Sequence, residues 1–101
     1  MKKIKICGVD YQVVFMDRIN DDDVLGEVSY VHSVIKISDR TSEDRQKQTL
    51  IHEMLHAIFF EAGLMELYDN EDVVNRVSTV LHQVLRDNDF KSIRKAKGED
   101  G

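Results

Sequence analysis

The spacing of apolar residues changes near residue 40, and this change limits the possible fold more than any other feature. Before it, apolar and polar residues alternate in Ile4-Lys5-Ile6 and across residues 33–38, and residues 11–15 are rich in β-branched and aromatic side chains. These patterns are typical of strands. After Asp39 apolar residues recur at intervals of three and four, the period of an amphipathic helix. The chain is therefore expected to be an α+β protein, with strands first and helices second.

Four segments of the first part are candidate strands, at residues 4–6, 11–15, 24–30 and 33–38. A turn is expected at Gly8-Val9-Asp10, and a polar loop at residues 20–23. Since the connections are short, we predict a small antiparallel sheet of three to four strands.

Two long helices are expected to pack on this sheet. Thr41 or Ser42 can cap the first, and Gly63 suits its end. Asn70 can cap the second, which should stop near residues 87–89. The expected core face of the first helix is Leu50, Ile51, Met54, Leu55 and Ile58. That of the second is Val73, Val74, Val77, Val80, Leu81, Val84 and Leu85.

Length and charge narrow the classes of function. The 101 residues suit one domain, which we place at residues 1–90, followed by a charged flexible tail at 91–101. Apolar runs are too short for a membrane helix. Lys and Arg number 14 and Asp and Glu 19, so the net charge of −5 argues against nucleic-acid binding. With no partner for a disulfide, the single Cys7 suits a reducing, cytoplasmic compartment.

The first predicted helix contains the sequence His52-Glu53-Met54-Leu55-His56. Histidines four residues apart lie on one helix face and can bind one metal ion. The intervening Glu53 points beside the metal, where its carboxylate can act as general base. The alternative is a helix with two surface or half-buried histidines. Because Arg45 and Thr49 share the same face, that face is polar, which favours the metal site.

A catalytic zinc site needs a third protein ligand. The longer metzincin signature would require Gly at position 59 and His at 62, and the chain has Phe59 and Ala62 there. Cys7 lacks the surrounding glycine-rich motif of peptide deformylases. The remaining candidates for the third ligand are Glu61, Glu66, Asp69 and Glu71.

Glu71 opens the second predicted helix in the sequence Asn70-Glu71-Asp72-Val73-Val74-Asn75. A Glu on a second helix, followed four residues later by a polar side chain, resembles the gluzincin arrangement. The chain is similar to small phage-type members of the ImmA/IrrE-like group, or minigluzincins, over roughly residues 30–88. The resemblance implies a minimal zincin-like domain that binds one Zn²⁺ per chain through His52, His56 and Glu71. It also implies that Asn75 holds a ligand histidine in place through the free N–H of its ring.

The function implied by this resemblance is that of a zinc metallopeptidase in a bacterial or phage-infected cytoplasm, with Glu53 as catalytic base. Its partner would be a protein or peptide substrate, paired with an exposed edge strand at residues 33–38. An alternative is a non-catalytic, zinc-bound interaction module, for example a phage protein that docks on a host factor. Another is a metal-dependent hydrolase of a different bond.

Peptide hydrolysis also requires a donor for the charge that develops on the carbonyl oxygen. The larger thermolysin-like enzymes supply Tyr and His from a separate subdomain, for which this chain is too short. The candidates here are Tyr30, His32, Tyr68 and His82, of which His82 is interpreted as a surface or packing residue because it lies about 16 Å along the helix from Glu71.

Overall fold

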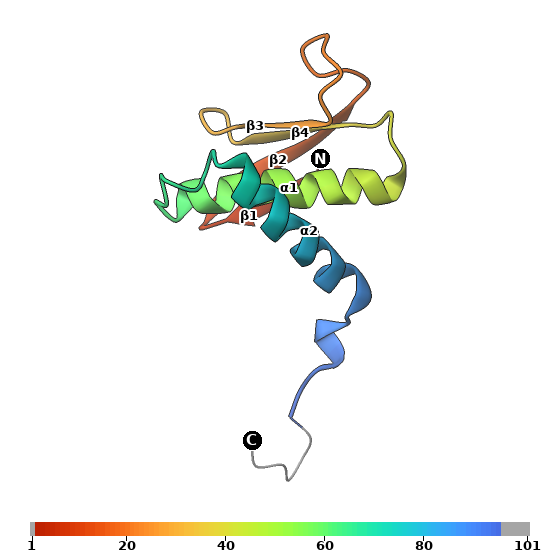
Figure 1. The fold of residues 1–101 in the computed structure, drawn as a ribbon, viewed down its shortest axis with the longest axis vertical. Helices are drawn as coiled ribbons and strands as arrows, with labels where there is room; N and C mark the ends of the chain where they lie inside the picture. Colours follow the sequence, from red (N-terminus) through yellow and green to blue (C-terminus); the bar gives the residue numbers. More distant parts are fainter. Residues whose placement is uncertain (1, 96–101) are drawn as a thin grey trace.

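The computed structural model describes residues 2–95 and has an α+β fold. The sequence-based prediction of the fold class is confirmed (Figure 1). The elements follow in the order β1 (Lys2–Ile6), β2 (Val9–Met16), β3 (Gly26–Ser29), β4 (Val34–Ser38), α1 (Glu43–Glu61), α2 (Glu71–Asp87) and the single 3₁₀ turn η1 (Phe90–Ser92).

The four strands form one mixed sheet in the order β1-β2-β4-β3. Strands β1 and β2 pair antiparallel, as do β3 and β4, but β2 and β4 pair parallel, from Gln12↔Val34 to Met16↔Ser38. The predicted sheet was antiparallel throughout, so the prediction of this pairing was wrong. After β2 the chain passes over to the far edge to form β3, and β4 then returns between β3 and β2. Alternation of side chains fixes the two faces of a strand but not its neighbours.

The order of the strands also corrects the predicted edge. Residues 34–38 are bonded on both sides, to β2 and to β3, so the segment 33–38 is not an exposed edge strand. The edges of the sheet are β1 and β3. A peptide could therefore add to the sheet next to β3, but not next to β4.

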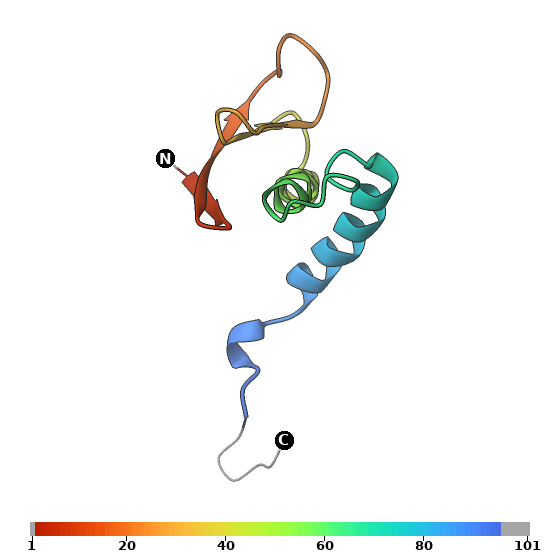
Figure 2. The same cartoon turned by 90° about the vertical axis from the view of Figure 1, so that its left-hand side faces the viewer.

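Helix α1 packs across one face of the sheet, nearest to β3 and β4 (Figures 1 and 2). The core lies between them, where apolar residues of β1, β2 and β4 meet the middle of α1. The buried cluster consists of Ile6, Tyr11, Val13, Ile35, Ile37 and Ala57. Burying this apolar surface fixes the position of α1 over the sheet.

Side-chain caps and a glycine define the bounds of the helices as the sequence predicted. The Ser42 hydroxyl accepts a hydrogen bond from the backbone N–H of Arg45 at 3.2 Å, and the Asn70 side chain accepts one from Val73 N–H at 3.2 Å. Gly63 follows α1 with a φ of 76°, a left-handed conformation that glycine adopts without strain. Asn70 thus makes Glu71 the first residue of α2.

The apolar face predicted for α2 is only partly covered. The buried residues of α2 are Val74, Ser78 and His82, which face α1, whereas Val77 and Val80 are 42% and 61% exposed. Figure 2 shows the reason, since the later turns of α2 run away from the sheet. The apolar period predicts which residues share a face, but not whether another element packs on it.

Neither helix of the described chain has the length and hydropathy needed to cross a bilayer. Of the tail predicted at 91–101, Lys91 and Ser92 lie in η1, and residues 96–101 lie outside the described part of the chain.

Candidate metal centre

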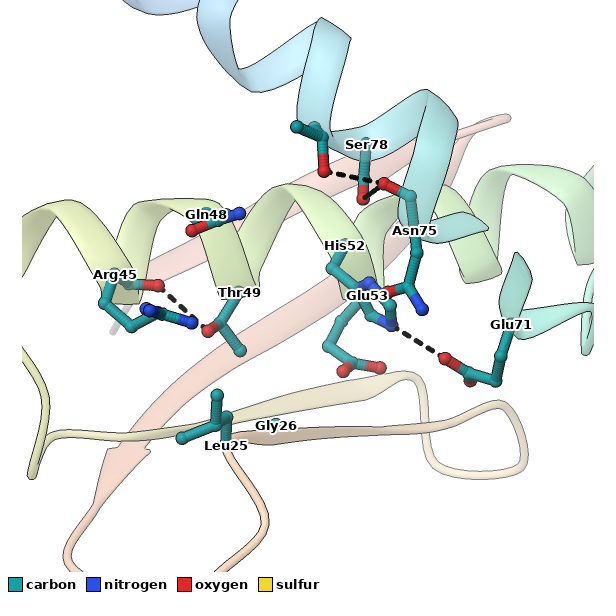
Figure 3. Close-up of a pocket in the computed structure, with 11 residues that line it drawn as sticks. Leu25, Gly26, Arg45, Gln48, Thr49, His52, Glu53, Glu71, Asn75 and Ser78 are labelled. Carbon is teal, nitrogen blue, oxygen red and sulfur yellow. Dashed lines mark hydrogen bonds and ion pairs between the residues drawn. The ribbon is translucent and has the colours of Figure 1, made fainter. Parts of the chain in front are cut away.

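The side chains of His52, His56 and Glu71 converge between α1 and the start of α2 (Figure 3). We call these three side chains the metal triad. One ligand atom from each lies within 4.8 Å of the other two. The Glu71 carboxylate contacts both rings, with one oxygen 3.3 Å from His52 Nε2 and the other 2.9 Å from His56 Nε2. This group could therefore hold a metal ion.

The donor set of the metal triad fits a zinc ion. Two ligands at about 2.0–2.1 Å from a tetrahedral ion are about 3.3 Å apart, which is close to both contacts of Glu71. Two imidazoles and one carboxylate leave the fourth position free for water or substrate, as a catalytic site requires. The packing of α1 also assists binding, because burial lowers the pKa of His52, and the neutral ring is the form that binds metal.

A backbone contact fixes the orientation of His56. Its Nδ1 lies within hydrogen-bonding distance of the Tyr68 carbonyl oxygen. Since a carbonyl only accepts, Nδ1 carries the proton, and Nε2, the atom beside Glu71, is the nitrogen left to bind a metal. Such a partner commonly holds a metal-binding histidine in place. Tyr68 belongs to the loop between Gly63 and Asn70. This loop therefore orients His56 and also positions Glu71 at the start of α2.

Glu53 lies on the side of α1 that faces β3. Its side chain is buried, with only 8% exposed, and it contributes to the wall of the groove beside the metal triad. Burial raises the pKa of the Glu53 carboxyl to about 7, opposed by His56 and reinforced by the charges of Glu71 and Glu27. A carboxylate with a pKa near neutral pH suits exchange of protons with a reacting group.

A glycine allows β3 to approach Glu53. A Cβ at Gly26 would lie 2.6 Å from Thr49 Cγ2 and 3.0 Å from Glu53 Oε2. Real Cβ atoms do not make such contacts, so any larger residue would push the strand away from α1. No sequence signal marks this role, because a glycine inside the strand predicted at residues 24–30 gives no sign of what lies opposite.

The other acidic candidates for the third ligand lie elsewhere. Glu61 accepts a hydrogen bond of 2.5 Å from the Tyr11 hydroxyl, which turns it towards the sheet. Glu66 is exposed in the loop, and Asp69 lines the neighbouring cleft without joining the metal triad. Of the four alternatives that the sequence left open, Glu71 is the one whose carboxylate lies beside both histidines.

Asn75 lies one turn beyond Glu71 and lines the same groove as His52 and Glu53 (Figure 3). In residues 2–95 its side chain forms no hydrogen bond with either histidine, and the partner of His56 is the Tyr68 carbonyl instead. A supporting role of Asn75 when metal is bound stays a prediction.

Of the four candidate donors for the carbonyl oxygen, the structure brings Tyr30 and Tyr68 to the metal triad. Both line a cleft with Glu53 and His56, and their rings meet edge to face with centroids 5.5 Å apart. Burial, and then the charge of Glu53, raises the pKa of Tyr30 to about 12, so its hydroxyl keeps its proton.

The two remaining candidate donors do not take part in the site. His32 is exposed in the turn between β3 and β4. His82 packs against Asp44, with 3.3 Å between Nε2 and Oδ1, as expected for a packing residue.

A groove passes over the metal triad between β3, α1 and α2. On one side it opens into a cavity of about 360 Å³ next to Gly26, Arg45, Thr49 and Asn75. On the other side, next to Tyr30, Tyr68 and Asp69, lies a cleft of about 260 Å³. Both cavities share Glu53 and Glu71, so an extended ligand in the groove would cross the metal triad.

Comparison of the chain with models of protein families, with curated proteins and with solved structures gave no match.

Proposed function

We propose that this protein is a zinc-dependent metallopeptidase of the gluzincin type. The observation that carries the proposal is the placement of Glu71. The helix cap at Asn70 and the loop that holds His56 bring its carboxylate to within 2.9–3.3 Å of both histidine Nε2 atoms. His52, His56 and Glu71 would hold the zinc, whose chemistry is to polarise a carbonyl oxygen and to make a water molecule more acidic.

Glu53 is the proposed general base. Its carboxylate would accept a proton from the attacking water and pass it to the nitrogen of the leaving amine. Its burial and its pKa near 7 support this role, because the group can both take up and release a proton near neutral pH. Tyr30 or Tyr68 would donate a hydrogen bond to the carbonyl oxygen as charge develops on it.

The proposed substrate is an extended peptide that adds to β3. This strand is an edge of the sheet and lies directly beside Glu53, with Gly26 at the closest approach. Backbone hydrogen bonds to an edge strand bind a peptide in a fixed register. The scissile carbonyl would then lie over the metal triad.

The experiment is hydrolysis of an unfolded protein such as reduced casein, followed by mass spectrometry of the products. Zinc-loaded protein should cleave it, whereas chelated protein and zinc-loaded Glu53→Gln should not. Elemental analysis should find close to one zinc per chain in both loaded proteins. If Glu53→Gln cleaves as fast as the unsubstituted chain, the proposed mechanism is wrong. If the zinc-loaded chain cleaves nothing, the alternative of a non-catalytic zinc module is favoured.

A further inference from the structure

The two ends of the groove differ in charge. Among residues 2–95, Arg45 is the one Lys or Arg side chain that lines the cavity on the side of the α1 N-terminus. The cleft on the other side contains Glu27 and Asp69 in addition to the shared carboxylates, and no Lys or Arg of the described part of the chain lines it. An anionic group of a ligand would be attracted to the Arg45 end and repelled from the other.

The guanidinium of Arg45 is available for a ligand. It forms no ion pair with any carboxylate among residues 2–95, although other arginines of the chain do so. The nearest acid on the same helix turn, Asp44, is engaged by His82 and Arg86 instead. Figure 3 shows the Arg45 side chain extending along α1 towards Thr49, and hence towards the metal triad.

The spacing along α1 gives the distance from the metal triad. Arg45 precedes His52 by seven residues, or about 10 Å of helix. An extended peptide covers this distance in about three residues, at about 3.3 Å each. Since the side chain of Arg45 points towards the metal triad, the peptide residue that it contacts would lie two to three residues from the cleaved bond.

The direction of β3 gives the direction of the peptide. Gly26 lies against Thr49 and Glu53, while Tyr30, just after the strand, stacks on Phe60 with ring centroids 4.3 Å apart. Strand β3 therefore runs the same way as α1. A peptide added antiparallel, the slightly more stable pairing, would run the opposite way. Its C-terminal part would then lie in the cavity with Arg45.

We infer that Arg45 binds a carboxylate of the substrate, two to three residues on the C-terminal side of the cleaved bond. This inference rests on the proposed peptidase function and goes beyond it, because it names the class of substrate. The carboxylate is either an Asp or Glu side chain or the C-terminus of a short peptide, since a guanidinium binds both in the same bidentate geometry. Arg45 would thus set specificity without touching the reacting atoms.

The test uses two synthetic libraries of randomised octapeptides, one with a free C-terminal carboxylate and one with a C-terminal amide. Zinc-loaded chain should prefer Asp, Glu or the free C-terminus two to three residues after the cleaved bond. Arg45→Glu should lose this preference and gain one for Lys and Arg. For a single acidic peptide, Arg45→Gln should raise KM about tenfold and leave kcat nearly unchanged. The same variant should leave KM unchanged for the matched peptide with Gln in place of Glu.

Lys47→Glu is the matched control, because it makes the same change of charge on the same helix at an exposed residue outside the groove. It should keep the acidic preference. If Arg45→Glu keeps that preference as well, or if the unsubstituted chain has none, the role of Arg45 is refuted while the peptidase function stands.

A second measurement separates this inference from the failure of catalysis. Two fluorescein-labelled peptide pools are titrated with the zinc-loaded Glu53→Gln protein, and binding is followed by anisotropy. The acidic pool carries Glu and a free C-terminus, whereas the amide pool has Gln in place of every Asp and Glu and an amidated C-terminus. The acidic pool should bind about tenfold more tightly than the amide pool, and adding Arg45→Gln should remove the difference. Absence of hydrolysis with this binding pattern refutes the peptidase function but supports the carboxylate site. Equal binding of both pools refutes the site.

Discussion

Glu53 is held in an environment that disfavours its charge. Helix α1 directs it towards β3, and the glycine at position 26 lets the strand close over it. Burial of this carboxylate therefore lowers the stability of the folded protein. Catalytic groups commonly lie in such unfavourable environments.

The cost of the buried carboxylate should appear in the pH dependence of stability of the metal-free protein. The pKa of Glu53 is raised from 4.5 to about 7, so between these values the folded state binds more protons than the unfolded state. Stability therefore falls as the pH rises through this window. Glu53→Gln should stabilise the chelated protein by about 3 kcal/mol at pH 8 and by much less at pH 5. Urea denaturation at both pH values measures the gain in stability, and Glu66→Gln, at an exposed residue, is the control. An equal gain from Glu53→Gln at both pH values would contradict the prediction.

Substitution of Gly26 should disturb both the fold and the groove. Gly26→Ala places a methyl group against Thr49 Cγ2 and should cost about 1–3 kcal/mol of unfolding free energy. Thr49→Ser removes that methyl group and keeps the hydroxyl that donates to the Arg45 carbonyl. The double variant should therefore recover part of the loss in a denaturant titration. If the changes in unfolding free energy of the two single variants add in the double variant, the contact between residues 26 and 49 is not the cause of the destabilisation.

At the scale of the elements, two helices approach each other at two separate places. The metal triad joins the middle of α1, at His52 and His56, to the start of α2, and near the start of α1 Asp44 contacts His82 and Arg86. The helices therefore run antiparallel, and a metal ion would link them only at the loop end.

Substitution of Glu71, the ligand that α2 contributes, should lower zinc affinity far more than substitution of nearby acidic residues. Glu71→Ala is expected to weaken zinc affinity by orders of magnitude, because it removes one of three ligands. Glu66→Ala and Asp69→Ala should leave affinity nearly intact, and Asn75→Ala should weaken it roughly 10–100-fold if it supports a ligand when metal is bound. Competition titrations with a zinc chelator measure all four variants. Strong loss in Asp69→Ala would point to a different third ligand.

Local signals predicted the helices and most of the metal triad well. The caps at Ser42 and Asn70 and the spacing of His52 and His56 each depend on residues within one or two helix turns. The order of the strands depends on contacts between distant segments, so the predicted edge at 33–38 and the antiparallel sheet were wrong. The Tyr68 carbonyl belongs to the backbone, and no sequence pattern marks it as the partner of His56.

The molecule as a whole is elongated. Its principal extents are 57 × 31 × 29 Å, because the later turns of α2 and the residues after them lead away from the sheet (Figure 2). In the described part of the chain, η1 packs against no other element. The metal triad and the groove lie at the opposite end of α2.

Truncation after Asn88 should therefore leave the site intact. Zinc affinity and the rate of peptide cleavage should match those of the full chain, because no residue beyond 88 lines the groove in residues 2–95. The melting temperature should change by no more than about 2 °C, since little apolar surface becomes exposed. Calorimetry and a zinc titration of the shortened chain test this. A marked loss of affinity would place the C-terminal segment in contact with the site.

The positions of the metal triad in the sequence have a consequence for how such a protein could diverge. All three of its side chains lie between residues 52 and 71, whereas the wall of the groove formed by the sheet comes from residues 25–30. In the proposed peptidase, reactivity and selectivity would thus depend on separate stretches of chain. Laboratory selection for a new substrate should gather changes around residues 25–30 and at position 45, and leave the metal-binding stretch as it is.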